Sequence, residues 1–201
     1  MNTKNLGLIV IIGLILLLGG CGCSGYNTMV TQDQNVKGKW GNVQSEYQRR
    51  SDLIPNLVNT VQGAANFEKS TLEAVIGARA KATQTTIDAG DLTPENIAKY
   101  QAAQSELSGA LSRLLVTVEQ YPDLKANQNF RDLQAQLEGT ENRIKVARND
   151  FNTAVQGFNT TVKSFPNVIF ANMFGFKEKG FFAADAGAEK APTVNFPSTA
   201  K

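Results

Sequence analysis

Apolar residues recur every three or four positions along most of this chain, from about residue 32 to residue 165. That spacing has a period near 3.5, which keeps the apolar residues on one face of an α-helix. No stretch alternates between apolar and polar residues for long enough to predict a strand. The pattern therefore predicts an all-α protein whose helices pack through long apolar stripes, as in bundles and coiled coils.

The stripe divides into three predicted helices, at about 34–81, 93–121 and 130–165. Thr93-Pro94-Glu95 is typical of a helix start. Threonine caps free backbone amides, and proline lacks the backbone N–H that has no partner in the first helical turn. Short loops between long helices favour antiparallel packing. With a further short helix expected at 167–174, the sequence predicts an elongated antiparallel bundle of three to four helices.

Prolines mark the expected ends and bends of these helices. Pro122 and Pro166 are expected to end the second and third helices. Pro55 lies inside the first and should kink it. At 1.5 Å per residue the first helix would be about 70 Å long, so part of it should overhang the others or bend.

The N-terminus has the features of a membrane signal. Residues 6–18 are all apolar or glycine, and the uncharged stretch extends to Tyr26. The shorter run has the length of a signal-peptide core, whereas the longer stretch, at about 20 residues, could span a bilayer. Leu18-Gly19-Gly20-Cys21 is similar to the cleavage motif of bacterial lipoproteins, which makes Cys21 the candidate lipidation site. A single-pass anchor and a lipid anchor both stay open, and both favour an extracytoplasmic position for the rest of the chain.

The composition excludes several classes of function. The chain contains no histidine, so it lacks Ser-His and Cys-His nucleophile pairs and the Glu-x-x-His metal sites of helical bundles. Its net charge of +2 is too small and too evenly spread for a nucleic-acid-binding surface. It also lacks a glycine-rich phosphate loop and a nucleophile elbow. We therefore predict a protein that is not an enzyme, with no catalytic residues, cofactor or metal and no nucleic-acid partner.

Five charged residues lie at or beside the apolar stripes: Arg50, Glu68, Arg79, Glu141 and Arg148. An unpaired buried charge costs several kcal/mol, so charges near a helix seam usually pair across it. The favoured interpretation is a set of interhelical ion pairs that fix the helix register. The alternative is a polar binding site inside the bundle.

The chain changes character after Pro166. Phe170, Met173, Phe174 and Phe176 are expected to dock on the bundle, and Phe170, Phe174 and Phe176 also form the candidate partner surface. From Gly175 onward the chain is rich in glycine, alanine, proline and lysine, so it should be extended or disordered. The predicted division is an anchor or signal at 1–26, a bundle at 27–176 and a flexible or extended tail at 177–201.

Several motifs together resemble the LemA family, and they cover nearly the whole chain from Tyr26 onward. They are Tyr26-Asn27, Trp40, the run from Gln48 to Val58 containing Arg49-Arg50-Ser51-Asp52-Leu53-Ile54-Pro55, Glu68, Ala78-Arg79-Ala80, Tyr121-Pro122-Asp123-Leu124-Lys125-Ala126-Asn127, Phe130, Leu133, Glu138-Gly139-Thr140-Glu141-Asn142-Arg143-Ile144, Ala147-Arg148-Asn149, Phe151-Asn152, Phe165-Pro166, Phe174-Gly175-Phe176 and Val194-Asn195-Phe196.

The resemblance implies a bacterial cell-envelope protein with an N-terminal membrane anchor and an all-helical bundle. Family members have no established activity, so the resemblance transfers no catalytic residues. Genes of the family often lie near those of membrane metalloproteases or TPM-domain proteins, which implies an envelope protein partner. The Gly-Cys-Gly-Cys stretch at 20–23 departs from common members, and it is what keeps lipidation open.

We expect a membrane-anchored interaction or scaffold protein. Two alternatives remain at this stage. One is a self-assembling structural protein of the envelope, in which the long helices form a homo-oligomer. The other is a ligand carrier or enzyme that uses Arg50, Glu68 and Arg148.

Overall fold

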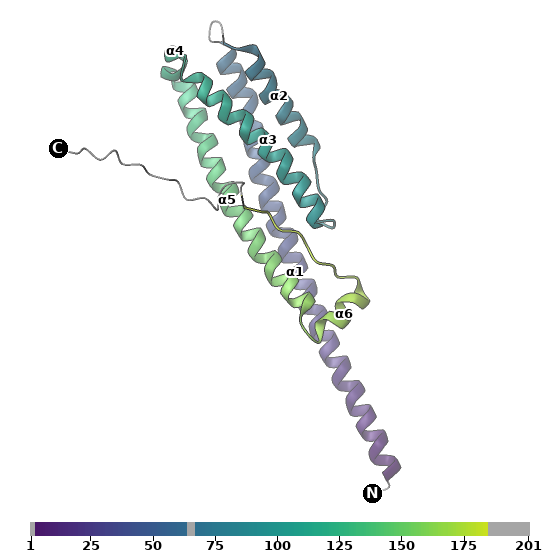
Figure 1. Cartoon of the computed structure of the whole chain (residues 1–201). Helices are drawn as coiled ribbons and strands as arrows, with labels where there is room; N and C mark the ends of the chain where they lie inside the picture. The colour runs from purple at the N-terminus through teal and green to yellow at the C-terminus, as the bar shows by residue number, and fades with distance from the viewer. Residues whose placement is uncertain (1–2, 64–66, 185–201) are drawn as a thin grey trace, which may run out of the picture.

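The computed structural model describes residues 3–63 and 67–184, with side chains from residue 22 onward. These residues form six α-helices and contain no strand (Figure 1). The helices are α1 (Thr3–Gln62), α2 (Lys69–Gln84), α3 (Pro94–Val118), α4 (Pro122–Ala126), α5 (Gln128–Lys163) and α6 (Asn167–Phe174). The all-α prediction is confirmed.

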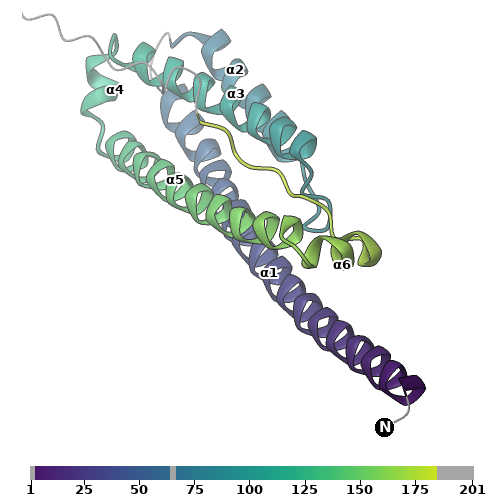
Figure 2. The same cartoon turned by 60° about the horizontal axis from the view of Figure 1, so that its bottom comes forward.

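The molecule is an elongated helical bundle built on the antiparallel pair α1 and α5, which lie side by side in both views (Figures 1 and 2). The α2–α3 hairpin packs along one end of this pair, and the short α4 makes the turn into α5. The small α6 lies at the other end, against both α1 and α5. Beyond α6, α1 continues out of the bundle towards the N-terminus (Figure 1). We call the end with α6 the basal end and the end with α4 the distal end.

The first predicted helix is in fact two helices, so the prediction of one helix over 34–81 was wrong. The first of the two ends at Gln62 and is followed by Gly63, and α2 begins at Lys69. Glycine favours helix ends because it loses the most backbone freedom inside a helix. The apolar spacing continues across the break because both helices pack into one core. Pro55 lies inside α1 without ending it.

The α1 helix also begins far earlier than expected, at Thr3, so the apolar N-terminal run and the first bundle helix form one continuous helix. Its 60 residues correspond to about 90 Å. No helix among the residues with described side chains is long and apolar enough to cross a membrane. The side chains of the apolar run 6–18 lie outside that set, as does Cys21, so the anchor and lipidation predictions rest on the sequence.

Local caps explain where the middle helices begin. Thr93 caps α3 as predicted, because its hydroxyl accepts a hydrogen bond from the Asn96 amide. Asn127 caps α5 in the same way, accepting from the Asn129 and Phe130 amides. Pro122, expected only to end a helix, instead starts α4, since its ring is compatible with the first helical turn.

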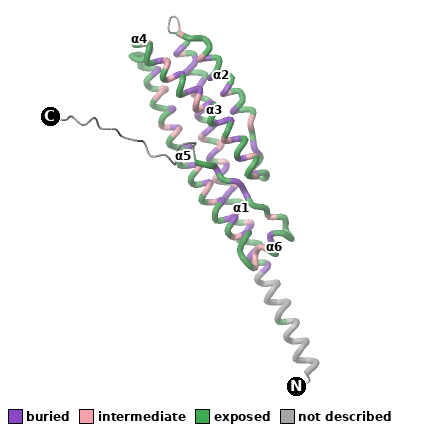
Figure 3. Tube along the Cα trace, in the orientation of Figure 1, coloured by how far each residue is buried: buried purple, intermediate pink, exposed green. Residues whose placement is uncertain are grey.

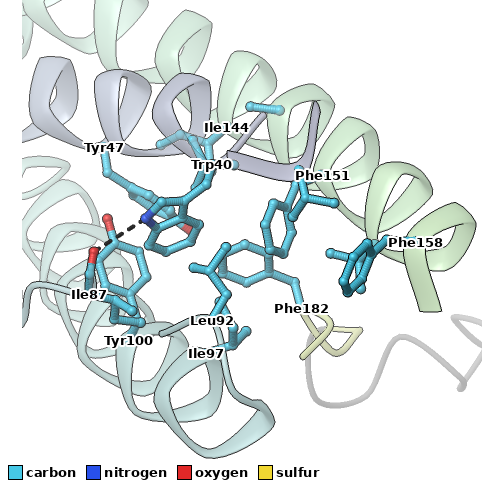
Figure 4. Close-up of a cluster of buried hydrophobic side chains, with 14 of the residues drawn as sticks. Trp40, Tyr47, Ile87, Leu92, Ile97, Tyr100, Ile144, Phe151, Phe158 and Phe182 are labelled. Atoms are coloured by element: carbon cyan, nitrogen blue, oxygen red, sulfur yellow. Dashed lines mark hydrogen bonds between the residues drawn. The ribbon is translucent and has the colours of Figure 1, made fainter. Parts of the chain in front are cut away.

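Buried residues follow one another along the whole bundle (Figure 3). Their side chains form two clusters, a basal core and a distal core. The basal core is rich in aromatic rings: Trp40, Tyr47, Tyr100, Phe151, Phe158 and Phe182 lie together, and the Trp40 indole N–H donates to the carbonyl of Ile87 at 3.3 Å (Figure 4). The distal core is largely aliphatic and includes Ile54, Leu57, Leu107, Leu114 and Leu137.

The chain after α6 is extended and packs along the bundle as far as Ala184. Gly175, with φ of 77°, ends α6 in the left-handed conformation that favours glycine. Residues 177–184, here called the strap, then run back along the bundle, where they are bonded to side chains of α3 and α5. Residues 185–201, which include the Val194-Asn195-Phe196 motif, lie outside the described part of the chain.

Candidate functional site

Arg50 is the centre of the polar group inside the bundle. It projects from α1 and is only 1% exposed. Its guanidinium donates to Glu141 on α5 at 2.5 Å, and to the Ser108 hydroxyl and the Gln104 side-chain oxygen on α3, each at 2.7 Å. Three helices are thus joined through one side chain. The arrangement matches the interhelical pairing that the sequence led us to expect for Arg50 and Glu141.

The surroundings of Arg50 stabilise its charge within the bundle. Its guanidinium carbon lies 5.0 Å from the centre of the Tyr47 ring, a cation–π contact. The Tyr47 ring packs edge-on against that of Tyr100, and burial raises the pKa of the Tyr100 phenol well above its usual value of 10. The Nε atom of Arg50 is buried and has no hydrogen-bond partner within the described structure. A fully satisfied network would leave no such atom, so this one is held at some energetic cost.

A cleft of about 600 Å³ opens beside this network. Gln101, Ser105, Lys145 and Arg148 line it together with Arg50 and Glu141. The Glu141 carboxylate accepts hydrogen bonds, and the other five side chains can donate them. Across the described residues, no group of three or more acidic, histidine or cysteine side chains is placed to hold a metal ion.

Arg79 makes a different contact from the ion pair we predicted. Its Nε donates to the backbone carbonyl of Ser51 at 2.9 Å, from α2 to α1. Ser51 lies four residues before Pro55, and a proline has no amide to donate to the carbonyl at that position. Arg79 therefore satisfies the carbonyl that Pro55 leaves without its helical partner.

Glu68 does not lie at the bundle seam. It is exposed at the start of α2, where its carboxylate accepts hydrogen bonds from the hydroxyls of Ser70 at 2.7 Å and Thr71 at 3.4 Å. The prediction placed it on a continuous first helix. Because α1 ends at Gln62, Glu68 lies at the N-cap of α2 instead.

Arg148 joins α5 to the strap. It donates to the Ala183 carbonyl at 2.8 Å, and its guanidinium carbon lies 5.1 Å from the centre of the Phe182 ring. Phe182 is only 4% exposed and packs on Trp40 and Phe151. We did not predict this core residue, because the sequence around it has no helical or strand period.

Three side-chain amides hold the backbone of the strap. Asn159, Asn152 and Gln101 each donate to a strap carbonyl and accept from the amide of the same residue, in bonds of 2.9 to 3.0 Å. Gly180 also lies close to α3, since a Cβ there would come within 2.6 Å of Pro94 Cα. The strap is therefore fixed mainly through its backbone, with Phe182 as its apolar anchor.

The predicted partner surface is only partly exposed. Phe170 and Phe176 are half-buried against the basal core, and Phe176 packs on Phe158 with ring centres 6.3 Å apart. Phe174 is half exposed.

Cys23, two residues beyond the candidate lipidation site, is an exposed free cysteine.

Comparisons with known proteins agree with the sequence motifs. The LemA family model matches residues 39–196. Magnetosome proteins MamQ 1 and MamQ 2 of Paramagnetospirillum magneticum are each 27% identical to this chain over 178 residues, which cover 78% of the chain and 64% of the relative. Magnetosome protein MamQ of Magnetospirillum gryphiswaldense is 26% identical with the same coverage. The chain thus spans about 64% of the length of these curated relatives. The match over most of its length shows that the chain belongs to the LemA family.

Proposed function

We propose that this protein is a non-enzymatic interaction or scaffold module of the cell envelope, anchored in a membrane through its N-terminus. The bundle would lie on the extracytoplasmic side and present its surface to an envelope protein. The proposed division is an anchor at 1–26, a bundle at 27–176 and a tail at 177–201, of which the strap residues 177–184 pack on the bundle.

One observation carries this proposal: α1 is a single helix from Thr3 to Gln62. A helix without a break between the apolar run and the bundle transmits the orientation of the anchor to the whole domain. Such a connection suits a protein that holds a surface at a fixed height above the membrane. Similarity to the MamQ proteins supports membrane association.

The character of the interior agrees with a structural role. The buried charge of Arg50 is used in bonds between helices, which join α1 to α3 and α5. The exposed apolar side chains Val116 on α3 and Val146 on α5 offer contact points along the long sides of the bundle.

The test is photo-crosslinking of the full-length protein in its native membranes. A photoreactive phenylalanine analogue would replace Val116 or Val146 in separate variants, with the unmodified protein as the control. A specific adduct with one envelope protein supports the proposal and locates the surface. Adducts only between copies of the chain would show a self-assembling protein, and the absence of protein adducts at both positions would contradict the proposal.

The form of the anchor can be read from the intact mass of the purified protein. Lipidation at Cys21 removes the first 20 residues and adds acyl chains, whereas a transmembrane anchor leaves the chain whole. A Cys21→Ala variant that keeps its full length and stays in the membrane would show that lipidation is not needed.

A further inference from the structure

Four large apolar side chains gather on the outside of the basal end. Phe165 is 83% exposed, Met173 67%, Ile169 57% and Phe174 50%. All four lie within ten residues, on α6 and the turn that precedes it. No charged residue occurs from Ser164 to Phe176, and lysines stand at both ends, Lys163 and Lys177. We call the four exposed side chains the basal face.

Contacts with α1 fix the height of α6 along that helix, and the partly exposed Met173 and Phe174 border these contacts. Gly22 gives room for the Phe170 ring, since a Cβ there would lie 2.9 Å from it. Tyr26 packs edge-on against Phe174, with ring centres 4.9 Å apart. A groove lined by Gly22, Cys23 and Tyr26 on one side and by Phe170 and Met173 on the other marks this junction. The short helix α6 is therefore held level with residues 22–26 of α1.

That level coincides with the expected edge of the bilayer. The apolar run ends at Leu18, four residues or about 6 Å before Gly22. The headgroup layer on each side of a bilayer is also about 5–7 Å thick. A lipid anchor leads to the same height, because Cys21 directly precedes Gly22. Either anchor would bring α6 into the interfacial layer.

The distribution of charge along α1 agrees with this depth. No charged residue lies between Lys4 and Asp33. Asp33 is bonded to Lys37 and Lys179, each at 2.8 Å, and lies seven residues or about 10 Å above Tyr26. Beyond Lys4, the first charged residue of α1 is therefore Asp33, which lies on the bundle side of the level of α6. Lys163, which precedes the uncharged segment 164–176, forms an ion pair with Glu178, with its Nζ 2.7 Å from a carboxylate oxygen.

We propose that the basal face lies in the interfacial layer of the bilayer that holds the N-terminal anchor, with Phe165, Ile169, Met173 and Phe174 in contact with lipid. This inference rests on the proposed anchor. Aromatic and aliphatic side chains flanked by lysines are typical of such layers. The face gives the bundle a second attachment beside α1, so its tilt is fixed and protein partners bind along its long sides.

The test uses tryptophan fluorescence in phosphatidylcholine vesicles with brominated acyl chains, which quench tryptophan on contact. Met173→Trp and Ile169→Trp place the probe on the basal face, and Val146→Trp is the matched control on an exposed apolar site of α5. The full-length protein is reconstituted at about one copy per vesicle, and the wild type, with buried Trp40 alone, supplies the background. Flotation of the vesicles measures the anchor independently.

We expect brominated lipid to quench the added emission of both basal-face variants, and to leave that of Val146→Trp unchanged. If the protein floats with the vesicles but neither basal probe is quenched, the inference is overturned and the anchor stands. If the protein does not float, the anchor fails and the inference fails with it. A photoreactive residue at Met173 that captures protein instead of lipid in native membranes would also overturn it.

Discussion

The basal and distal cores solve the same packing problem with different side chains. In the distal half, α1, α2, α3 and α5 run together, and aliphatic residues such as Leu57, Leu107 and Leu114 fill the space between four backbones. In the basal half, α1 and α5 extend beyond the hairpin. Large rings such as Trp40 and Phe151 fill the volume there, together with residues from non-helical segments. In the half of the bundle where fewer helices meet, bulky aromatic side chains and packed non-helical segments fill the volume that helices fill in the other half.

The Arg50 network forms the boundary between the two cores. Tyr47 before it and Ile144 on α5 belong to the basal core, whereas Ile54 and Leu137 belong to the distal core. Hydrophobic packing alone would let the helices slide by a turn. The hydrogen bonds that Arg50 donates to Gln104 and Ser108 on α3 and to Glu141 on α5 specify one register, a role that buried polar groups serve in other helical assemblies.

Removing the Arg50 side chain should cause the largest loss of unfolding free energy among the changes considered. Arg50→Ala leaves a cavity between three helices and removes the charged donor of the buried Gln104, so we expect a loss of about 3–5 kcal/mol in unfolding free energy. Urea denaturation in detergent, followed by Trp40 fluorescence and by helical circular dichroism, measures it. Separate transitions for the two signals would show that the cores unfold independently.

A paired replacement provides the control for that experiment. Arg50→Met with Glu141→Leu fills the site with apolar side chains, and we expect it to recover part of the lost stability, because the cavity is filled while Gln104 still lacks its charged donor. If Arg50→Ala alone costs under about 1 kcal/mol, an ordinary point-mutant effect, the network does not hold the boundary.

The next prediction concerns the strap, which only the basal core requires. Phe182→Ala removes a buried ring that packs on Trp40 and Phe151, and we expect a loss of about 3 kcal/mol, the lower end for such truncations because the strap can partly follow the cavity. Phe181→Ala, at the neighbouring half-exposed position, is the matched control and should change little. Equal losses in the two variants would show that the strap does not complete the basal core.

In the distal half, the contact between Arg79 and Ser51 can be tested by a double-mutant cycle. Arg79→Met should cost about 1–3 kcal/mol, since it leaves the Ser51 carbonyl without a charged donor. Pro55→Ala supplies an amide within α1, so the same Arg79→Met change should cost less in that background. Denaturation of the four proteins gives the coupling. Equal costs in both backgrounds would contradict the role assigned to Arg79.

The sequence predicts the helices well because each long helix must keep an apolar face, and that face repeats in the sequence. It could not reveal the break between α1 and α2. A stripe that continues across Gly63 looks the same whether the chain goes straight on or turns back to the same core. The error carried over to Glu68, which a continuous helix would have placed near the seam.

Tertiary contacts in irregular segments were equally beyond the sequence. Phe182 is held in the core because Asn152 bonds to its backbone and Gln101 bonds to the backbone of Ala183, and such bonds leave no periodic signal in the sequence. Arg50 and Glu141 could be identified, because charged residues near an apolar stripe need partners and few are available. Arg79 could not, since its partner is a carbonyl exposed by a proline rather than an acidic side chain.

The smallest change in unfolding free energy should come from the ion pair between Asp33 on α1 and Lys179 on the strap. Burial acts to raise the pKa of this carboxyl, but hydrogen bonds from Lys179 and Lys37 outweigh it and hold the pKa below its usual 3.8. A lowered pKa in the folded state means that Asp33 adds stability above its unfolded pKa and loses it as the pH falls through the folded value. The unfolding free energies of the wild type and Asp33→Asn should therefore differ at pH 7 and converge in acid. An equal difference at pH 7 and at pH 3 would show that this link does not depend on the carboxylate charge.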